Sequence, residues 1–189
     1  MLASHPAMRQ LRREGNVPSI HGNKHWPSAD LLMDYLSEHP PRRGVRVMDV
    51  GCGWGLAGIY CAVHHRARVT AVDADDAVFP YLHAHADLNK VRITTLRSRF
   101  ERITTAQLSE IDLLVATDVC FWDELVRPWQ NLIRRALRAG VKRIVIADPE
   151  RAPFFTLAEY CIERFDADLL DWRSKRYPRI SGSILEIRA

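Results

Sequence analysis

Short apolar segments alternate with longer amphipathic segments along most of the chain. The apolar segments are rich in valine, isoleucine and leucine, which predicts β-strands at about 45–50, 68–72, 93–96, 111–116 and 143–147. The amphipathic segments predict a helix that Ser28 caps and Pro40 ends, and further helices at about 55–65, 77–89, 123–138 and 153–165. This alternation is typical of a parallel sheet with helices on both faces.

The ends of the chain depart from this alternation. Two further strands, at about 168–173 and 183–188, are separated by turn residues and predict an antiparallel hairpin. We therefore expect an α/β fold, a doubly wound, Rossmann-like seven-stranded sheet that is mostly parallel and ends in an antiparallel hairpin. Residues 1–27 are polar and contain three prolines, so we interpret them as an irregular or short-helical lead segment. Residues 28–189 are then a single domain.

Composition narrows the class of protein. Hydrophobic residues make up 47% of the 189, which excludes a disordered chain. The N-terminus has no apolar core of a signal peptide and no run reaches membrane-span length, so we expect a cytoplasmic protein with no membrane partner. The net charge of +4 comes from scattered arginines, so we expect no nucleic-acid partner. A monomer or weak dimer is the expected oligomeric state, which no feature of the sequence determines. The four cysteines are far apart, which predicts no disulfide and no metal site.

The segment 45–58, VRVMDVGCGWGLAG, joins a predicted strand to a predicted helix through a glycine turn. Such a turn lets a nucleotide-sized ligand approach the backbone closely. Two interpretations compete. Gly53 to Gly58 matches the dinucleotide pattern GxGxxG, but that pattern should begin where the strand ends, and the strand ends at about Gly51. Counted from the strand, the motif is an acid, Asp49, followed by Gly51, Gly53 and Gly55.

This second motif resembles the acid-x-GxGxG loop of seven-strand methyltransferases that use S-adenosylmethionine (SAM). A carboxylate beside the loop would repel a pyrophosphate, whereas it can hold the cationic amino-acid part of SAM. Asp73, at the end of the second predicted strand, can accept hydrogen bonds from ribose hydroxyls of either SAM or NAD. The resemblance implies SAM as the cofactor, bound by Trp26, Asp49, Gly51, Cys52, Gly53, Gly55, Asp73, Ala74, Phe100 and Thr117.

Two further motifs are similar to a family of protein-lysine methyltransferases. Asp118-x-x-Phe121, after the fourth predicted strand, resembles that family's Asp-x-x-Tyr/Phe motif, and Trp26-Pro-Ser-Ala resembles the segment that precedes its SAM domain. Residues 148–151, Asp-Pro-Glu-Arg, are most similar to the Asp-Pro-Gly-Arg stretch of the branch that methylates the electron transfer flavoprotein β subunit, with Glu150 in place of glycine. The alternative for Asp118 is a structural one, in which it caps the following helix.

The resemblance implies an enzyme that transfers methyl to a lysine amine of a protein by direct in-line displacement. Asp118 and Phe121 are then the catalytic residues, with Asp118 orienting the amine and Phe121 and Trp26 forming the wall beside it. A small-molecule N- or O-methyltransferase, a non-catalytic SAM-binding protein and, more remotely, an NAD-dependent oxidoreductase remain as alternatives. Of the histidines, His21 and His25 are candidates to approach a substrate, whereas those on the predicted helices, such as His65 and His85, are expected to be exposed.

Overall fold

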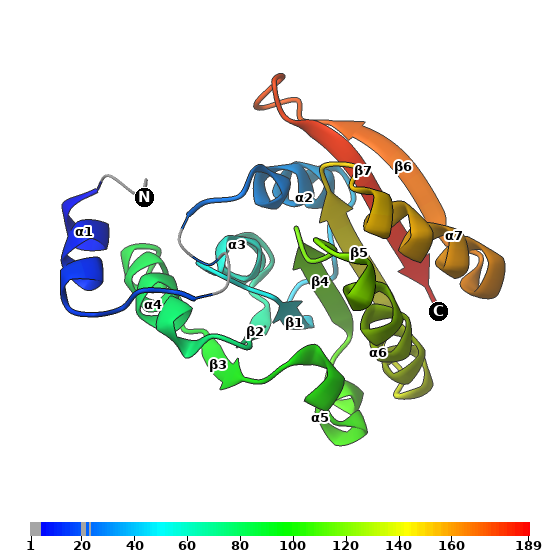
Figure 1. Ribbon diagram of the computed structural model, residues 1–189, viewed down its shortest axis with the longest axis horizontal. Coiled ribbons are helices and arrows are strands. Elements are labelled where there is room, and N and C mark those ends of the chain that lie inside the picture. Colours follow the sequence, from blue (N-terminus) through cyan, green and yellow to red (C-terminus); the bar gives the residue numbers. More distant parts are fainter. Residues whose placement is uncertain (1–4, 20–21, 23) are drawn as a thin grey trace.

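The computed structural model describes residues 5–19, 22 and 24–189, and it contains the expected seven-stranded sheet (Figure 1). The strand order is β3-β2-β1-β4-β5-β7-β6. The first five strands run parallel to one another, and β7 pairs antiparallel with both β5 and β6. Their bounds are β1 Arg46–Val50, β2 Arg68–Asp73, β3 Thr94–Arg97, β4 Leu113–Thr117, β5 Arg143–Asp148, β6 Asp168–Arg173 and β7 Ser181–Arg188.

Helices cover both faces of the sheet. The central strands are apolar along their length, so they need this cover, and they are buried on both faces. On one face, α2 (Pro27–Glu38), α3 (Leu56–His65) and α4 (Phe79–Leu88) bury apolar side chains against the strands. On the other, α5 (Thr105–Ser109), α6 (Val126–Arg138) and α7 (Ala152–Phe165) form a second core around Trp129 and Phe154. Adjacent strand residues alternate between the two cores, as Val47 and Met48 do in β1.

Several element boundaries differ from the prediction. Helix α2 begins at Pro27 with Trp26 as its N-cap, because proline suits the first helical position, and Ser28 lies inside the helix. Strand β4 begins at Leu113 rather than 111, and β7 begins at Ser181 rather than 183. Two short helical turns, 76–78 and 123–125, precede α4 and α6 and shorten those helices at their start.

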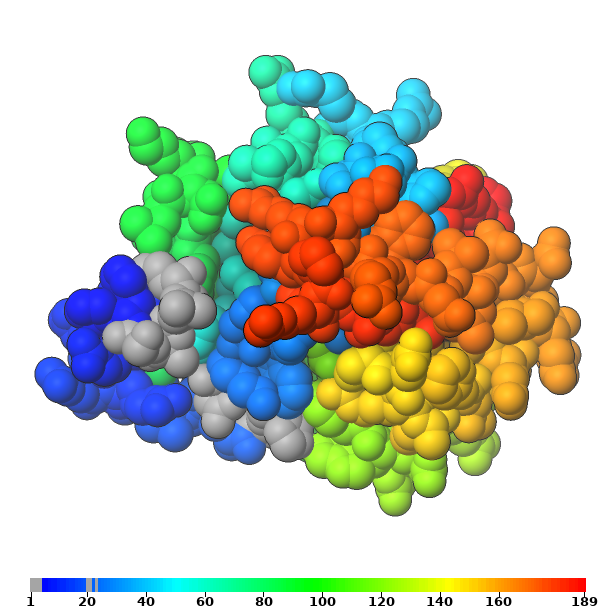
Figure 2. All heavy atoms as spheres, turned by 90° about the horizontal axis from the view of Figure 1, so that it is seen from above, coloured from blue at the N-terminus to red at the C-terminus, as the bar shows by residue number. Residues whose placement is uncertain are grey.

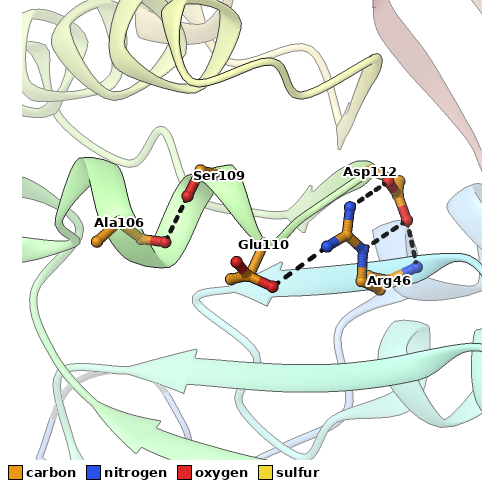
Figure 3. Close-up of polar contacts among 5 residues, drawn as sticks. All are labelled: Arg46, Ala106, Ser109, Glu110 and Asp112. Atoms are coloured by element: carbon orange, nitrogen blue, oxygen red, sulfur yellow. Dashed lines mark hydrogen bonds and ion pairs between the residues drawn. The ribbon is translucent and has the colours of Figure 1, made fainter.

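Asp112 explains why β4 begins after it (Figure 3). Its carboxylate accepts hydrogen bonds from the backbone N–H of Arg46 at 2.9 Å and from that residue's guanidinium at 2.8 and 3.0 Å. The same guanidinium lies 3.3 Å from Glu110. The hydrogen bonds from Arg46 lower the pKa of Asp112 to about 2, so the carboxylate stays ionised. This pair joins the first residue of β1 to the residue before β4.

The lead segment contains one helix, α1 (Pro6–Arg13), which packs beside α4. Met8 lies in a small cluster with Trp54 and Tyr81, and the Tyr81 hydroxyl donates to the carbonyl of Asn16. The Trp54 indole donates to the carbonyl of Gly22 at 3.0 Å, which draws the segment toward the glycine loop. In Figure 2 this segment, in blue, lies at one end of the molecule beside green residues. The domain boundary after residue 27 stays a prediction.

The C-terminal hairpin lies against α2. Asp34 of α2 accepts hydrogen bonds from the Trp172 indole at 2.9 Å and from the Ser174 hydroxyl at 3.1 Å. Figure 2 shows the orange and red hairpin beside the blue of α2. Of the helices in the described part of the chain, none is long and apolar enough to cross a membrane.

Candidate active site

A cavity of about 310 Å³ opens at the carboxyl ends of β1, β2 and β4. This edge is where open α/β sheets bind ligands, because the strand order reverses between β1 and β4. Ten residues expected at the site from sequence line it: Trp26, Gly51, Cys52, Gly53, Asp73, Ala74, Phe100, Thr117, Asp118 and Phe121. Asp49 and Gly55 do not line it. The structure thus brings most of the expected residues together on one cavity wall.

The glycine loop has glycine at two positions where a side chain would clash with its neighbours. Gly51 has φ +70°, and a Cβ there would lie 2.8 Å from the Val119 side chain that follows β4. Gly55 has φ +73° and caps α3, and a Cβ there would lie 2.6 Å from Leu82 of α4. Gly55 therefore serves the close packing of α3 on α4, whereas Gly51 lies on the cavity wall.

Asp49 lies behind the loop instead of facing the cavity. Its side chain is buried, and its Oδ2 accepts a hydrogen bond from the Gly58 backbone N–H at 2.9 Å. Burial raises the pKa of Asp49 to about 7, and the nearby charge of Asp73 adds to the rise. In this structure Asp49 holds the first turn of α3 to the end of β1, and contact with the amino-acid part of SAM stays a prediction.

Asp73 ends β2 with its carboxylate at the cavity. Its Oδ2 accepts the Gly53 backbone N–H and its Oδ1 accepts the Asp75 backbone N–H, each at 3.0 Å. Burial raises the pKa of this carboxyl. The backbone of Ala74 also hydrogen-bonds this carboxylate. These backbone bonds orient the carboxylate, and an ionised carboxylate has about four lone-pair sites, so acceptor capacity remains for a ligand.

The residues around Asp73 fit the adenosine part of SAM. Phe100 lines the cavity next to the loop after β3, and its ring packs on Trp129 with centroids 5.2 Å apart. The backbone of Phe100 is held by Arg135, whose guanidinium donates to its carbonyl at 2.9 Å. An apolar face, glycine backbone and a carboxylate with spare acceptor sites are what an uncharged nucleoside requires.

Asp118 lines the same cavity as the aromatic side chains of Trp26 and Phe121. The Trp26 and Phe121 rings meet edge to face with centroids 5.3 Å apart. Asp118 has φ +54° and its backbone N–H donates to the Ala147 carbonyl of β5 at 3.0 Å. It does not cap the next helical turn, whose N-cap is Trp122, so the capping alternative for Asp118 does not hold.

Arg151 contacts Asp118, although the sequence identified it only as the last residue of the Asp-Pro-Glu-Arg segment. One of its guanidinium nitrogens lies 2.8 Å from Asp118 Oδ1 and 2.8 Å from Asp148 Oδ2. The same guanidinium lies over the Phe121 ring, 4.3 Å from its centroid. Asp148 ends β5 and is fully buried, and burial raises its pKa to about 6 although Arg151 opposes the rise. A single cation thus joins two buried carboxylates behind the aromatic wall.

The histidines agree with expectation in part, since His64 and His83 on the helices are exposed as expected. His25 lines the cavity, and its Nε2 lies 2.7 Å from Asp30 Oδ2. His21 lies outside the described residues. His65 and His85 are buried rather than exposed, because His65 ends α3 against Tyr60 and His85 stacks on Trp54. Helical periodicity alone did not reveal these aromatic neighbours.

Together, the strand order, the glycine loop, the acid that ends β2 and the cavity define a class I methyltransferase. Residues 47–140 match a family model described as a methyltransferase domain. These residues form a methyltransferase domain of the seven-strand, SAM-dependent type, and the chain is similar to enzymes of the protein-lysine branch. SAM is the cofactor, as the resemblance implied.

Two relatives and one structure illustrate the match. The chain is 29% identical over 131 residues to the electron transfer flavoprotein β subunit lysine methyltransferase of Xenopus laevis, covering 69% of this chain and 52% of that protein. It is 30% identical over 122 residues to the calmodulin-lysine N-methyltransferase of Arabidopsis thaliana, covering 60% and 40%. TrmN from Thermus thermophilus superposes with a TM-score of 0.65 at 17% identity, covering 86% of this chain and 51% of that one. The chain spans about half the length of these curated relatives, or less.

Proposed function

We propose that this chain transfers a methyl group from SAM to the side-chain amine of a protein lysine. The observation that carries the proposal is Asp118, held by Arg151 at the aromatic end of a cavity whose other end fits adenosine. The lysine methyltransferases to which the chain is similar support a protein acceptor. Since the chain spans only part of their length, its activity and its acceptor are both proposals.

The residues at the aromatic end suit an amine that must be uncharged before it reacts. When bound, SAM supplies an electrophilic methyl carbon, which the amine attacks in line as the carbon–sulfur bond breaks. A free lysine has a pKa of about 10.4, so its proton has to leave to solvent first. Trp26 and Phe121 favour the neutral amine by desolvation. Asp118 accepts a hydrogen bond from the amine, and Arg151 offsets the negative charge that would otherwise retain the proton.

The cofactor residues take roles that follow from their positions. Asp73 would accept hydrogen bonds from the ribose hydroxyls with the acceptor capacity that its backbone bonds leave open. Phe100 and Ala74, which line the cavity, would pack on the adenine, and the loop of Gly51, Cys52 and Gly53 would face the ligand. Thr117, at the end of β4, lines the cavity next to Asp118 in the chain and would contact the cofactor.

The test combines labelling with calorimetry. The purified protein is incubated with methyl-labelled SAM and either a cell extract, purified electron transfer flavoprotein β subunit or purified calmodulin. We expect label on protein lysines. Asp118→Ala should abolish that labelling while affinity for S-adenosylhomocysteine, measured by calorimetry, persists. If transfer and binding are lost together, Asp118 is structural.

The other functions appear as distinct outcomes of this experiment. Label in the small-molecule fraction and none on protein would identify a small-molecule methyltransferase. Cofactor binding without turnover on any extract would identify a non-catalytic SAM-binding protein. The cytoplasmic location, the monomeric or weakly dimeric state and the lack of a nucleic-acid partner stay predictions.

A further inference from the structure

One of the chain's own lysines lies at the acceptor end of the cavity. Lys24 precedes α2 by three residues and lines the same cavity as Asp118 and Phe121. Its Nζ lies 4.0 Å from the centroid of the Trp26 ring. An ammonium over the face of an indole is attracted by the ring's quadrupole, so Trp26 holds this side chain at the cavity. Within the described part of the chain, no carboxylate forms an ion pair with it.

The other three lysines lie away from this cavity. Lys142 lines a different cavity, together with His39 and Asp112 at the amino end of the parallel strands. Lys175 lies on the C-terminal hairpin, where its ammonium pairs with Glu38 at 2.8 Å. Lys90 follows α4 on the exposed surface. Lys24 is therefore the chain's own amine that the fold brings to the acceptor wall.

We propose that Lys24 is an intramolecular methyl acceptor, so that the enzyme methylates its own lead segment. The inference rests on the proposed lysine-directed activity and adds a modification site to it. The Lys24 ammonium first leaves the Trp26 face and loses a proton to solvent. The nitrogen of the neutral amine then forms a bond to the methyl carbon as the carbon–sulfur bond of SAM breaks. The products are methylated Lys24 and S-adenosylhomocysteine.

Proximity is the physical reason to expect this reaction. An amine already held beside the reacting centre does not lose the translational freedom that a separate protein acceptor loses on binding. The Trp54 indole bonds to Gly22 and the Trp26 carbonyl accepts the Ala29 backbone N–H, so the chain on both sides of Lys24 is tied to the domain. Methylation keeps the positive charge of the side chain, so the product can stay on the Trp26 face.

The test needs no external acceptor. The purified full chain is incubated with methyl-labelled SAM alone, and peptide mass spectrometry locates the label. We expect label on Lys24, at a rate per molecule that does not change with protein concentration. Lys24→Arg should remove it, whereas the matched variant Lys142→Arg should keep it. Asp118→Asn should lose self-labelling yet still bind S-adenosylhomocysteine in calorimetry.

The outcomes separate this inference from the proposed function. If proteins of a cell extract are labelled but the chain itself is not, self-methylation is overturned and the lysine-directed activity stands. Label on any other lysine, or label on Lys24 that survives Asp118→Asn, also overturns it. A rate per molecule that rises with protein concentration would mean transfer between copies and overturn the intramolecular step. If the chain binds SAM but neither itself nor any extract protein is labelled, both proposals fail.

Discussion

Replacing Arg151 is the sharpest physical test of the acceptor site. Its guanidinium lies 2.8 Å from one oxygen of Asp118 and 2.8 Å from one oxygen of Asp148, whose side chains are only 3% and 1% exposed. The Arg151→Met variant keeps an unbranched apolar side chain over Phe121 and removes the cation. Two buried carboxylates then face each other without the positive charge between them.

The magnitude follows from the burial of both carboxylates. Removing one partner of a buried ion pair costs about 3–5 kcal/mol of folding free energy. The cost depends on pH because burial raises the pKa of Asp148 to about 6. A carboxyl whose pKa is raised on folding contributes stability that is present at low pH and is lost as pH rises through the folded pKa. Without Arg151 this pKa rises further, so we expect a larger loss at pH 8 than at pH 5.

The assay is urea unfolding at pH 5 and pH 8 for the wild type, Arg151→Met, Asp148→Asn and the double variant. Adding Asp148→Asn to Arg151→Met should recover part of the stability at pH 8, because one buried charge is gone. Arg151→Lys is the matched control that keeps a cation and should lose less. A cost for Arg151→Met below about 1 kcal/mol at pH 8, or an equal cost at both pH values, would refute the reasoning.

Three further changes test other parts of the site. Burial raises the pKa of Asp49 to about 7, so the free energy of unfolding should fall as pH rises from about 4 to 7. In urea unfolding, Asp49→Asn should reduce that fall by up to about 4 kcal/mol. The new amide oxygen can still accept the Gly58 N–H. Unchanged pH dependence would contradict this. Gly55→Ala places a Cβ 2.6 Å from a leucine of α4 and should cost about 1–3 kcal/mol, measured by thermal unfolding. Gly53→Ala, whose Cβ would meet no atom within 4 Å, should cost less, and equal losses would contradict the packing argument. Asp73→Ala should weaken binding of S-adenosylhomocysteine in calorimetry by about 10- to 100-fold, and unchanged affinity would rule out a ribose contact.

Local patterns in the sequence were enough to predict the fold class and the cofactor. The β-branched runs, the glycine spacing after β1 and the acid that ends β2 each depend on residues close together in the chain. Parallel strands have their carboxyl ends at the same edge of the sheet, so the residues that follow them lie close together. This is why most of the expected residues line one cavity. The predicted starts of α2 and β4 were less accurate. Helix α2 begins at Pro27 rather than after a Ser28 cap, and the residue before β4, Asp112, is bound to Arg46.

Only the tertiary structure decided which way the side chains point and which distant residues meet. Asp49 has the sequence position of a cofactor residue, but its side chain turns behind the loop to the Gly58 amide. Asp118 and Arg151 are far apart in the chain, and they meet because each follows one of the adjacent parallel strands β4 and β5. Lys24 reaches the acceptor wall because the lead segment docks against the glycine loop. Such contacts depend on strand register and on the alternation of side-chain direction along each strand. A short sequence pattern does not show how one strand is aligned with another that is distant in the chain.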